Sequence, residues 1–142
     1  MENIKIKNKI KELNNSSQEV LQLLLSDTLQ EMGCRDRVSK DILRRLVLVY
    51  LSLFGEENYF EYDDLNVKER NIICRIISKG IASIYVDEEY ITDDNAMDRL
   101  IIIEDLIEML CFLTGFCRST IKRLVIRDIK IYFYAGWKWD FI

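Results

Sequence analysis

The 142 residues contain not one proline, and apolar residues recur along them every three or four positions. A proline inside a helix costs about 3 kcal/mol, so a chain without any is typical of a mostly helical protein. The i, i+3, i+4 spacing of the apolar residues predicts amphipathic helices. We expect five of them, over residues 17–32, 39–54, 67–86, 96–114 and 119–134. The predicted fold class is therefore all-α.

The N-terminal stretch is ambiguous. Ile4, Ile6 and Ile10 suit a short extra helix, but their alternation with lysine also allows a strand. The first eleven residues have no long apolar run, so we expect no cleavable leader. A chain of this length buries roughly 68–70% of its unfolded surface. We predict one domain over residues 1–142, with residues 1–15 as an N-terminal extension.

Three residue pairs have the spacing of helix N-termini. Ser16 with Glu19 predicts a capping box, in which each side chain accepts a hydrogen bond from the other residue's backbone N–H. Two looser pairs of the same kind are expected further on, Asn66 with Glu69 and Asn95 with Asp98.

The five glycines fall into two groups. Four of them follow apolar segments, where a left-handed residue that ends a helix is usual: Gly33, Gly55, Gly115 and Gly136. The fifth, Gly80, lies inside a predicted helix, and it suggests the close approach of another backbone.

The composition argues against catalysis. The chain has no histidine, and it has neither a phosphate-binding glycine loop nor a GxSxG motif. Acidic doublets at 63–64, 88–89 and 93–94 offer carboxylates for metal or acid–base work, but such doublets are more often solvated helix ends. We predict that the protein is not an enzyme, with no catalytic residues, no metal site and no cofactor.

The cysteines and the charge point to a cytosolic protein with a protein partner. No two cysteines form a CxxC pair, and we expect all four to be reduced core residues: Cys34, Cys74, Cys111 and Cys117. The net charge of −4 disfavours nucleic acid as the partner. One helix carries a basic stripe that could track phosphates, although such a stripe is more often a solvated face: Arg118, Lys122, Arg123, Arg127 and Lys130.

The segment 96–114 is the most apolar of the chain. A membrane span is not expected, because Glu104, Asp105 and Glu108 interrupt an apolar run that is already shorter than the roughly 20 residues a span needs. We predict a central helix surrounded by the others. Arg99 begins this helix on its most apolar side, where it either reaches water or an internal acid such as Glu88 or Glu89, or binds a ligand.

An apolar central helix that begins with an arginine resembles the Bcl-2 family. The first homology motif of that family, E-L-F-x-D-x-x-N-W-G-R-[IV], is similar without a gap to residues 89–100, E-Y-I-T-D-D-N-A-M-D-R-L. The family's Asn, Trp and Gly are replaced here, and the glycine is the most serious loss because it lets a ligand helix approach closely. The matching positions are Glu89, Asp93, Arg99 and the similar Leu100, and the replaced ones are Ala96, Met97 and Asp98.

Two further motifs keep the family's order and spacing. Residues 135–141, A-G-W-K-W-D-F, resemble the second homology motif with its Gly-Trp-Asp core. Residues 51–56, L-S-L-F-G-E, resemble the Leu-x-x-x-Gly-Asp core of the third, and Gly55 lies 44 positions before Arg99.

The resemblance implies a Bcl-2-like helical bundle that holds an amphipathic BH3 helix in a hydrophobic groove. It implies that Arg99 pairs with an aspartate of the ligand. It also implies that residues 39–54 and 67–86 form the walls of the groove. The implied partners are pro-apoptotic BH3 proteins, either Bim-like or Bak/Bax-like. The expected BH3-binding residues are Arg99, Tyr50, Leu51, Phe54, Ile77, Ile81, Leu100 and Ile103.

The resemblance is greatest to the divergent Bcl-2-like proteins of large DNA viruses, of the iridovirus or poxvirus type. It implies an apoptosis inhibitor of the host cytosol, peripheral at mitochondria and without a transmembrane anchor, since the chain stops at Ile142. An exposed groove without an anchor also suggests a homodimer. The alternative is a Bcl-2-like helical adaptor that inhibits host immune signalling through a surface outside the groove.

Overall fold

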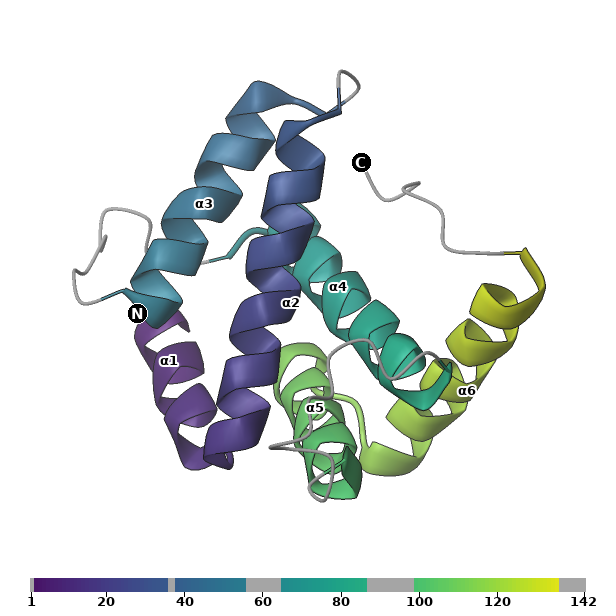
Figure 1. Ribbon diagram of the computed structural model, residues 1–142. Helices are drawn as coiled ribbons and strands as arrows, with labels where there is room; N and C mark the ends of the chain where they lie inside the picture. The colour runs from purple at the N-terminus through teal and green to yellow at the C-terminus, as the bar shows by residue number, and fades with distance from the viewer. Residues whose placement is uncertain (1, 36–37, 56–64, 87–98, 136–142) are drawn as a thin grey trace.

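Every helix predicted from the apolar spacing is present in a computed structural model of the chain (Figure 1). The structure describes residues 2–35, 38–55, 65–86 and 99–135, and within these ranges all regular structure is helical. The all-α prediction is confirmed. The helices are α1 (Glu2–Glu12), α2 (Asn15–Gly33), α3 (Lys40–Phe54), α4 (Val67–Val86), α5 (Arg99–Thr114) and α6 (Arg118–Ala135).

Two helices share the centre of the bundle. The α5 helix packs against α1, α2, α4 and α6, and its Ile102 and Leu106 are completely buried. The prediction of a buried apolar helix there is confirmed. The α4 helix, which we expected to be a wall, packs against α2, α5 and α6 and is buried to the same degree at Ile72 and Ile84. Its isoleucines cover more than one side of the helix, so it has neighbours on several sides.

The N-terminal segment is helical and belongs to the core. Ile6 and Ile10 of α1 are 2% and 4% exposed, and α1 packs against α3 and α5. Lys7 Nζ also donates a hydrogen bond to the carbonyl oxygen of Gly55, just after the end of α3, at 3.2 Å. Of the two sequence readings, the helix is the one that the structure adopts.

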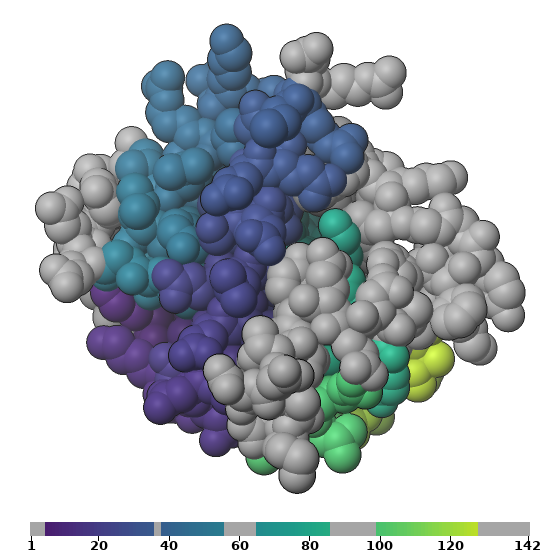
Figure 2. All heavy atoms as spheres, in the orientation of Figure 1, coloured from purple at the N-terminus to yellow at the C-terminus, as the bar shows by residue number. Residues whose placement is uncertain are grey.

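The α2 and α3 helices lie side by side and form one face of the molecule together with α1 (Figures 1 and 2). In the space-filling view, the side chains of α2 run down this face beside those of α3 and α1 (Figure 2). The inner side of α2 packs against α4 and α5. Because α2 has α3 on one flank and the core beneath it, it separates much of α3 from α5.

Gly80 marks the closest approach of α2 and α4. A Cβ atom at this position would lie 2.4 Å from Cδ1 and 2.5 Å from Cδ2 of Leu24. Such distances are shorter than any van der Waals contact, so only glycine fits without movement of the neighbouring side chain. The predicted close approach is confirmed, although the neighbour is a leucine side chain of α2 and not a backbone.

The α4 helix begins with a complete capping box. Asn66 N–H donates to Glu69 Oε1 at 3.0 Å, and Glu69 N–H donates to Asn66 Oδ1 at 2.8 Å. Arg45 of α3 donates to the other oxygen of the same carboxylate at 2.7 Å. Glu69 is 3% exposed. Through these hydrogen bonds it joins the start of α4 to α3.

The predicted start of α2 is wrong by two residues. The N-cap is Asn14 and not Ser16, and the Asn14 side chain makes no capping hydrogen bond to the helix. An acid of α5, described below, supplies the cap instead. The third pair, Asn95 with Asp98, lies outside the described residues.

The glycine and cysteine predictions are only partly correct. Gly115 has φ of 77° and ends α5 in the left-handed conformation, whereas Gly33 is the last residue of α2 and Gly55 is extended. Gly136 lies outside the described residues. Cys74 and Cys111 are half-buried, but Cys34 and Cys117 are exposed, because one follows the end of α2 and the other precedes α6. All four thiols are free.

Candidate functional site

An apolar groove lies between α5 and α6, next to the end of α4. Its cavity has a volume of about 390 Å³, and aliphatic and aromatic side chains form most of its wall. A charged pair, Glu104 and Lys122, stands at the wall with Nζ to Oε1 at 3.5 Å. The lining residues are Tyr85, Ile103, Glu104, Ile107, Lys122, Val125 and Ile126.

Two residues predicted from the resemblance lie on α5 one turn before residues that line this groove, although neither lines the cavity itself. Arg99 opens α5 one helical turn before Ile103, and residues four apart lie on the same side of a helix. Leu100 precedes Glu104 in the same way, and it is 72% exposed. The structure thus brings Arg99, Leu100 and Ile103 together at the first turn of α5.

Large apolar side chains are exposed around the groove. Tyr85 at the end of α4 is 56% exposed, and Ile126 on α6 is 53% exposed. Both line the cavity, together with the buried Ile103 of α5. Exposed apolar residues that gather at one concave site are typical of a surface that binds another protein.

Two acids of α5, Glu104 and Glu108, pair with cations of other helices at the surface. The Arg118 guanidinium donates a hydrogen bond to Glu104 Oε2 and a second one to Glu108 Oε2 at 2.9 Å. Lys9 of α1 donates to the other oxygen of Glu108 at 3.1 Å. The hydrogen bond from Arg118 holds the pKa of Glu104 below its usual range, and the hydrogen bond to Glu108 raises the pKa of Lys9. These pairs link α6 and α1 to α5.

Asp105, the third acid that interrupts the apolar run of α5, contacts the start of α2. Its Oδ2 accepts hydrogen bonds from the backbone N–H and the side-chain amide of Asn14, and from the hydroxyl of Ser17. Glu104, Asp105 and Glu108 of α5 therefore each make contacts with another helix.

The three predicted groove residues of α3 lie elsewhere. Tyr50, Leu51 and Phe54 are half-buried, and the rings of Tyr50 and Phe54 pack with their centroids 5.3 Å apart. α3 packs mainly on α1 and α2. The crevice beside Tyr50, between α2, α3 and α4, measures about 10 Å³, which is room for about one water molecule. These residues are not on the groove between α5 and α6.

The two predicted groove residues of α4 are in the core. Ile77 and Ile81 are both 0% exposed, so neither contacts solvent in this structure. The predicted wall between residues 39–54 and 67–86 is closed here, because the side chains of α2 fill the space between those two helices. The sequence pattern could not show this, since apolar residues that line a groove and apolar residues of a core have the same spacing.

Six lining residues were not predicted as binding residues: Tyr85, Glu104, Ile107, Lys122, Val125 and Ile126. Ile126 sits among basic residues of α6, in a stripe interpreted as a solvated face. In the sequence, Ile126 is distinguished only as an apolar residue that falls outside the buried side of the helix. Single exposed apolar residues are common, so this pattern does not predict a binding site.

The basic stripe of α6 is divided between two sides. Arg118 and Lys122 pair with Glu104 of α5, whereas Arg127 lines a different cavity together with Arg75 of α4. The side chain of Lys130 lies outside the described residues. The stripe therefore contributes mainly to helix packing and not to one continuous basic face.

Within the described ranges, no three His, Cys, Asp or Glu side chains come close enough to hold a metal ion. No described helix combines the length and the apolarity that a membrane crossing requires. Most of the residues that resemble the first and second homology motifs, 89–98 and 136–141, lie outside the described residues, as does Glu88. No protein-family model, no curated protein and no solved structure matches the chain.

Proposed function

We propose that the protein is a protein-interaction module that binds an amphipathic BH3 helix in the groove between α5 and α6 and so inhibits apoptosis. The observation that supports this most is the groove itself. It is apolar, about 390 Å³ in volume, and flanked by the exposed Leu100 at the first turn of α5. Apolar anchors of a ligand helix would enter the cavity beside Tyr85 and Ile126.

Arg99 would set the direction in which the ligand helix lies in the proposed site. It lies one turn before Ile103, which lines the groove, so its guanidinium would meet a carboxylate of the bound helix. An arginine–carboxylate pair is directional and partly bidentate, and it would set the orientation of the ligand. The resemblance of residues 89–100 to the first homology motif supports the same role for Arg99.

Isothermal titration against a panel of BH3 peptides tests the proposal, with peptides of about 26 residues to cover the i to i+7 anchors. We expect tight binding of at least one peptide, weakened by Arg99→Glu and by Ile126→Glu. Each variant places a carboxylate where the proposed complex needs a cation or an apolar surface. Loss of about 2 kcal/mol or more at either position would be typical of an interface hot spot.

A matched variant separates the groove from other faces. Leu23 on α2 is 47% exposed, similar to Ile126, but it is not part of the groove. Leu23→Glu should therefore leave the binding constant unchanged. Equal loss of binding in Leu23→Glu and Ile126→Glu would move the site away from α5 and α6. No binding of any peptide would overturn the BH3 proposal and favour the alternative, an adaptor that acts on immune signalling through another surface.

The proposed setting is the host cytosol during a viral infection, where such a module would sequester pro-apoptotic proteins. Exposed apolar residues at the groove also support the proposal of a homodimer. Light scattering at increasing protein concentration tests this point. A monomeric mass at all concentrations would contradict it, whereas a dimer that dissociates in Ile126→Glu would place the contact at the groove.

A further inference from the structure

The α1 helix lies on the rest of the bundle as a separate helical ligand would. Its buried residues Ile6 and Ile10 and the following Leu13 are spaced i, i+4 and i+7, which is the anchor spacing of an amphipathic helix in a groove. The helix packs on α3 and α5, both far from it in the chain, and the next helix along, α2, is not one of its main neighbours. We call the surface of α3 and α5 under α1 the α1 site. It is a helix-binding surface whose occupant belongs to the chain itself.

Two lysines fix the position of α1 in the α1 site. Lys7 Nζ donates a hydrogen bond to the carbonyl oxygen of Gly55 at 3.2 Å, and Lys9 Nζ donates to Glu108 Oε1 at 3.1 Å. The partners in these two pairs are 48 and 99 positions apart in the chain. Neither contact uses the connector between α1 and α2, so an α1 helix from a second copy of the chain can make both of them in the same way.

The connector between α1 and α2 consists of Leu13 and Asn14 only. Figure 1 shows that the chain reverses its direction at this point. Asn14 has φ of −61° and ψ of 151°, so its φ is already that of an α-helix and only its ψ differs from the helical value of about −42°. A change of ψ at Asn14 takes away the reversal, and α1 then points away from its own site. Short connectors favour the exchange of a helix between copies, because the closed form has no spare length in which to turn.

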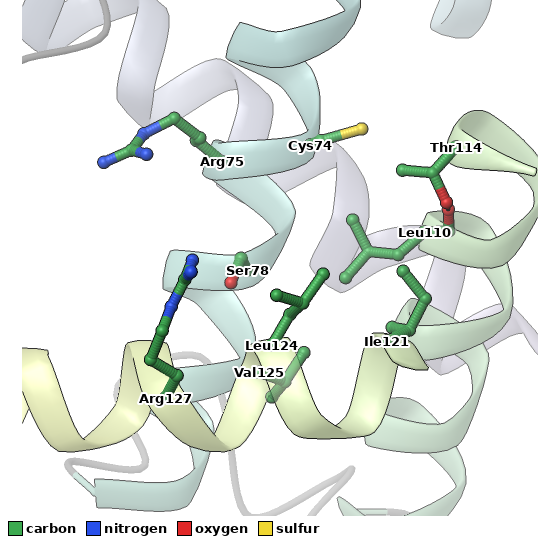
Figure 3. Close-up of a pocket in the computed structure, with 9 residues that line it drawn as sticks. All are labelled: Cys74, Arg75, Ser78, Leu110, Thr114, Ile121, Leu124, Val125 and Arg127. Carbon is green, nitrogen blue, oxygen red and sulfur yellow. The ribbon is translucent and has the colours of Figure 1, made fainter. Parts of the chain in front are cut away.

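The α6 helix at the other end of the described chain does not have this geometry. Gly115, between α5 and α6, has φ of 77°, so a continuous helix there requires φ to change sign. A cavity of about 130 Å³ also remains between α4, α5 and α6, beside Leu110 and Leu124 (Figure 3). A contact with an unfilled cavity selects its helix less strictly than a closely packed one. Exchange of a helix between copies is therefore expected at α1 and not at α6.

From these observations we infer that two copies of the chain exchange their α1 helices, so that α1 of each copy occupies the α1 site of the other. The exchanged dimer keeps the three apolar anchors and both lysine contacts of the monomer. It differs from the monomer only at the connector and where the two copies newly meet. The described residues that line the groove between α5 and α6 include none of α1, so the exchange does not depend on the BH3 proposal. A dimer formed through that groove would leave each α1 on its own copy.

The pair of Lys9 and Glu108 provides a direct test with the full chain. Unlabelled and isotope-labelled chains in equal amounts are unfolded in urea, refolded together at high concentration, and treated with a carbodiimide that joins adjacent lysine and carboxylate groups. Mass spectrometry of the separated dimer then shows whether each link joins like or unlike labels. About half of the links between Lys9 and Glu108 should join unlike labels, because random pairing makes about half of the dimers mixed.

A second pair of a lysine and a carboxylate is the matched control. Lys122 Nζ of α6 lies 3.5 Å from Glu104 Oε1 of α5, so the same reagent joins these two groups. Both helices stay within one copy in the exchanged dimer. The links between Lys122 and Glu104 should therefore join like labels only, in the monomer and in the dimer.

Two changes at the connector should shift the equilibrium in opposite directions. Asn14→Ala favours one continuous helix and should strengthen dimerisation about fivefold or more, as measured by light scattering. Insertion of Gly-Gly-Ser after Asn14 gives α1 room to fold back onto its own copy, and it should weaken dimerisation by a similar factor. Circular dichroism checks that each variant remains helical.

Two results would overturn the inference. One is a dimer in which every link between Lys9 and Glu108 joins like labels, because its copies then meet through another surface. The other is a monomeric mass at every concentration for both the unchanged chain and Asn14→Ala. Ile126→Glu keeps the two proposals apart, since it should abolish contact through the groove and leave the links between unlike labels in place.

Discussion

Ser17 of α2 donates its hydroxyl proton to Oδ2 of Asp105 on α5 at 2.5 Å, although the two residues are 88 positions apart in the chain. Ser17 is completely buried, and the same carboxylate oxygen accepts the backbone N–H of Asn14 at 3.2 Å. An acid on one helix thus satisfies the free donors at the start of another. This contact fixes where α2 begins and how it lies on α5.

We expect Asp105→Ala to destabilise the protein by about 1–3 kcal/mol, because it leaves the buried Ser17 hydroxyl without its acceptor. Urea unfolding followed by circular dichroism measures the change. Asp27→Asn is the control, since Asp27 is an exposed acid of the same α2 helix. An Asp105→Ala variant as stable as Asp27→Asn would show that the contact does not contribute to the fold.

Gly80→Ala should destabilise the protein by about 1–3 kcal/mol, because its Cβ would overlap the Leu24 side chain at 2.4 Å. Leu24→Ala removes those atoms, so the double variant should lose less stability than the sum of the two single losses. At Gly33 a Cβ would meet only Leu43 Cδ2 at 3.8 Å. Gly33→Ala should therefore be close to neutral, and additive losses at Gly80 and Leu24 would contradict the close packing of α2 on α4.

Arg45→Met should cost about 1.5–3 kcal/mol, because it leaves one oxygen of the buried Glu69 carboxylate without its charged donor at 2.7 Å. Methionine keeps most of the aliphatic stem, so the loss reports on the hydrogen bond and not on packing. Arg44→Met, at the exposed neighbouring position on α3, should change stability by less than about 0.5 kcal/mol. Thermal unfolding measures both variants. Similar losses of stability at both positions would show that the Arg45–Glu69 hydrogen bond does not stabilise the contact between α3 and α4.

Cys117 should be the most reactive thiol of the chain at neutral pH. Hydrogen bonds from Ser119 and then Thr120, at 3.3 and 3.2 Å from Sγ, lower its pKa to about 6, whereas burial raises the pKa of Cys74 to about 11. The thiolate is the nucleophile, so alkylation of Cys117 should rise with pH through about 6 and level off above pH 7.

Site-resolved mass spectrometry of iodoacetamide labelling, from pH 5 to 9, measures this profile over about two units on either side of neutrality. Ser119→Ala/Thr120→Val removes both donor hydroxyls and should move the midpoint to higher pH. The exposed Cys34 provides an internal comparison for access of the reagent. A labelling midpoint of Cys117 that does not move in the double variant would show that the two hydroxyls do not stabilise its thiolate.

The sequence by itself determined the helices and several of their ends. The 3.6-residue spacing and the absence of proline act within one segment, so they predicted the five helices now seen as α2 to α6. The capping box of Asn66 and Glu69 was visible for the same reason, since both partners lie within one turn. The close approach at Gly80 was also predictable, because a glycine inside a helix usually indicates a neighbouring element that leaves no room for a side chain.

Only the tertiary structure decided which apolar residues are core and which are surface. Ile77 and Ile81 have the same spacing as groove residues, yet both are completely buried, while Tyr85 and Ile126 remain exposed beside α5. The partners of Asp105 and Glu108 likewise come from other helices, and their pairing depends on how the helices cross. Local periodicity carries no information about such crossings, because they depend on which helices pack together across the bundle.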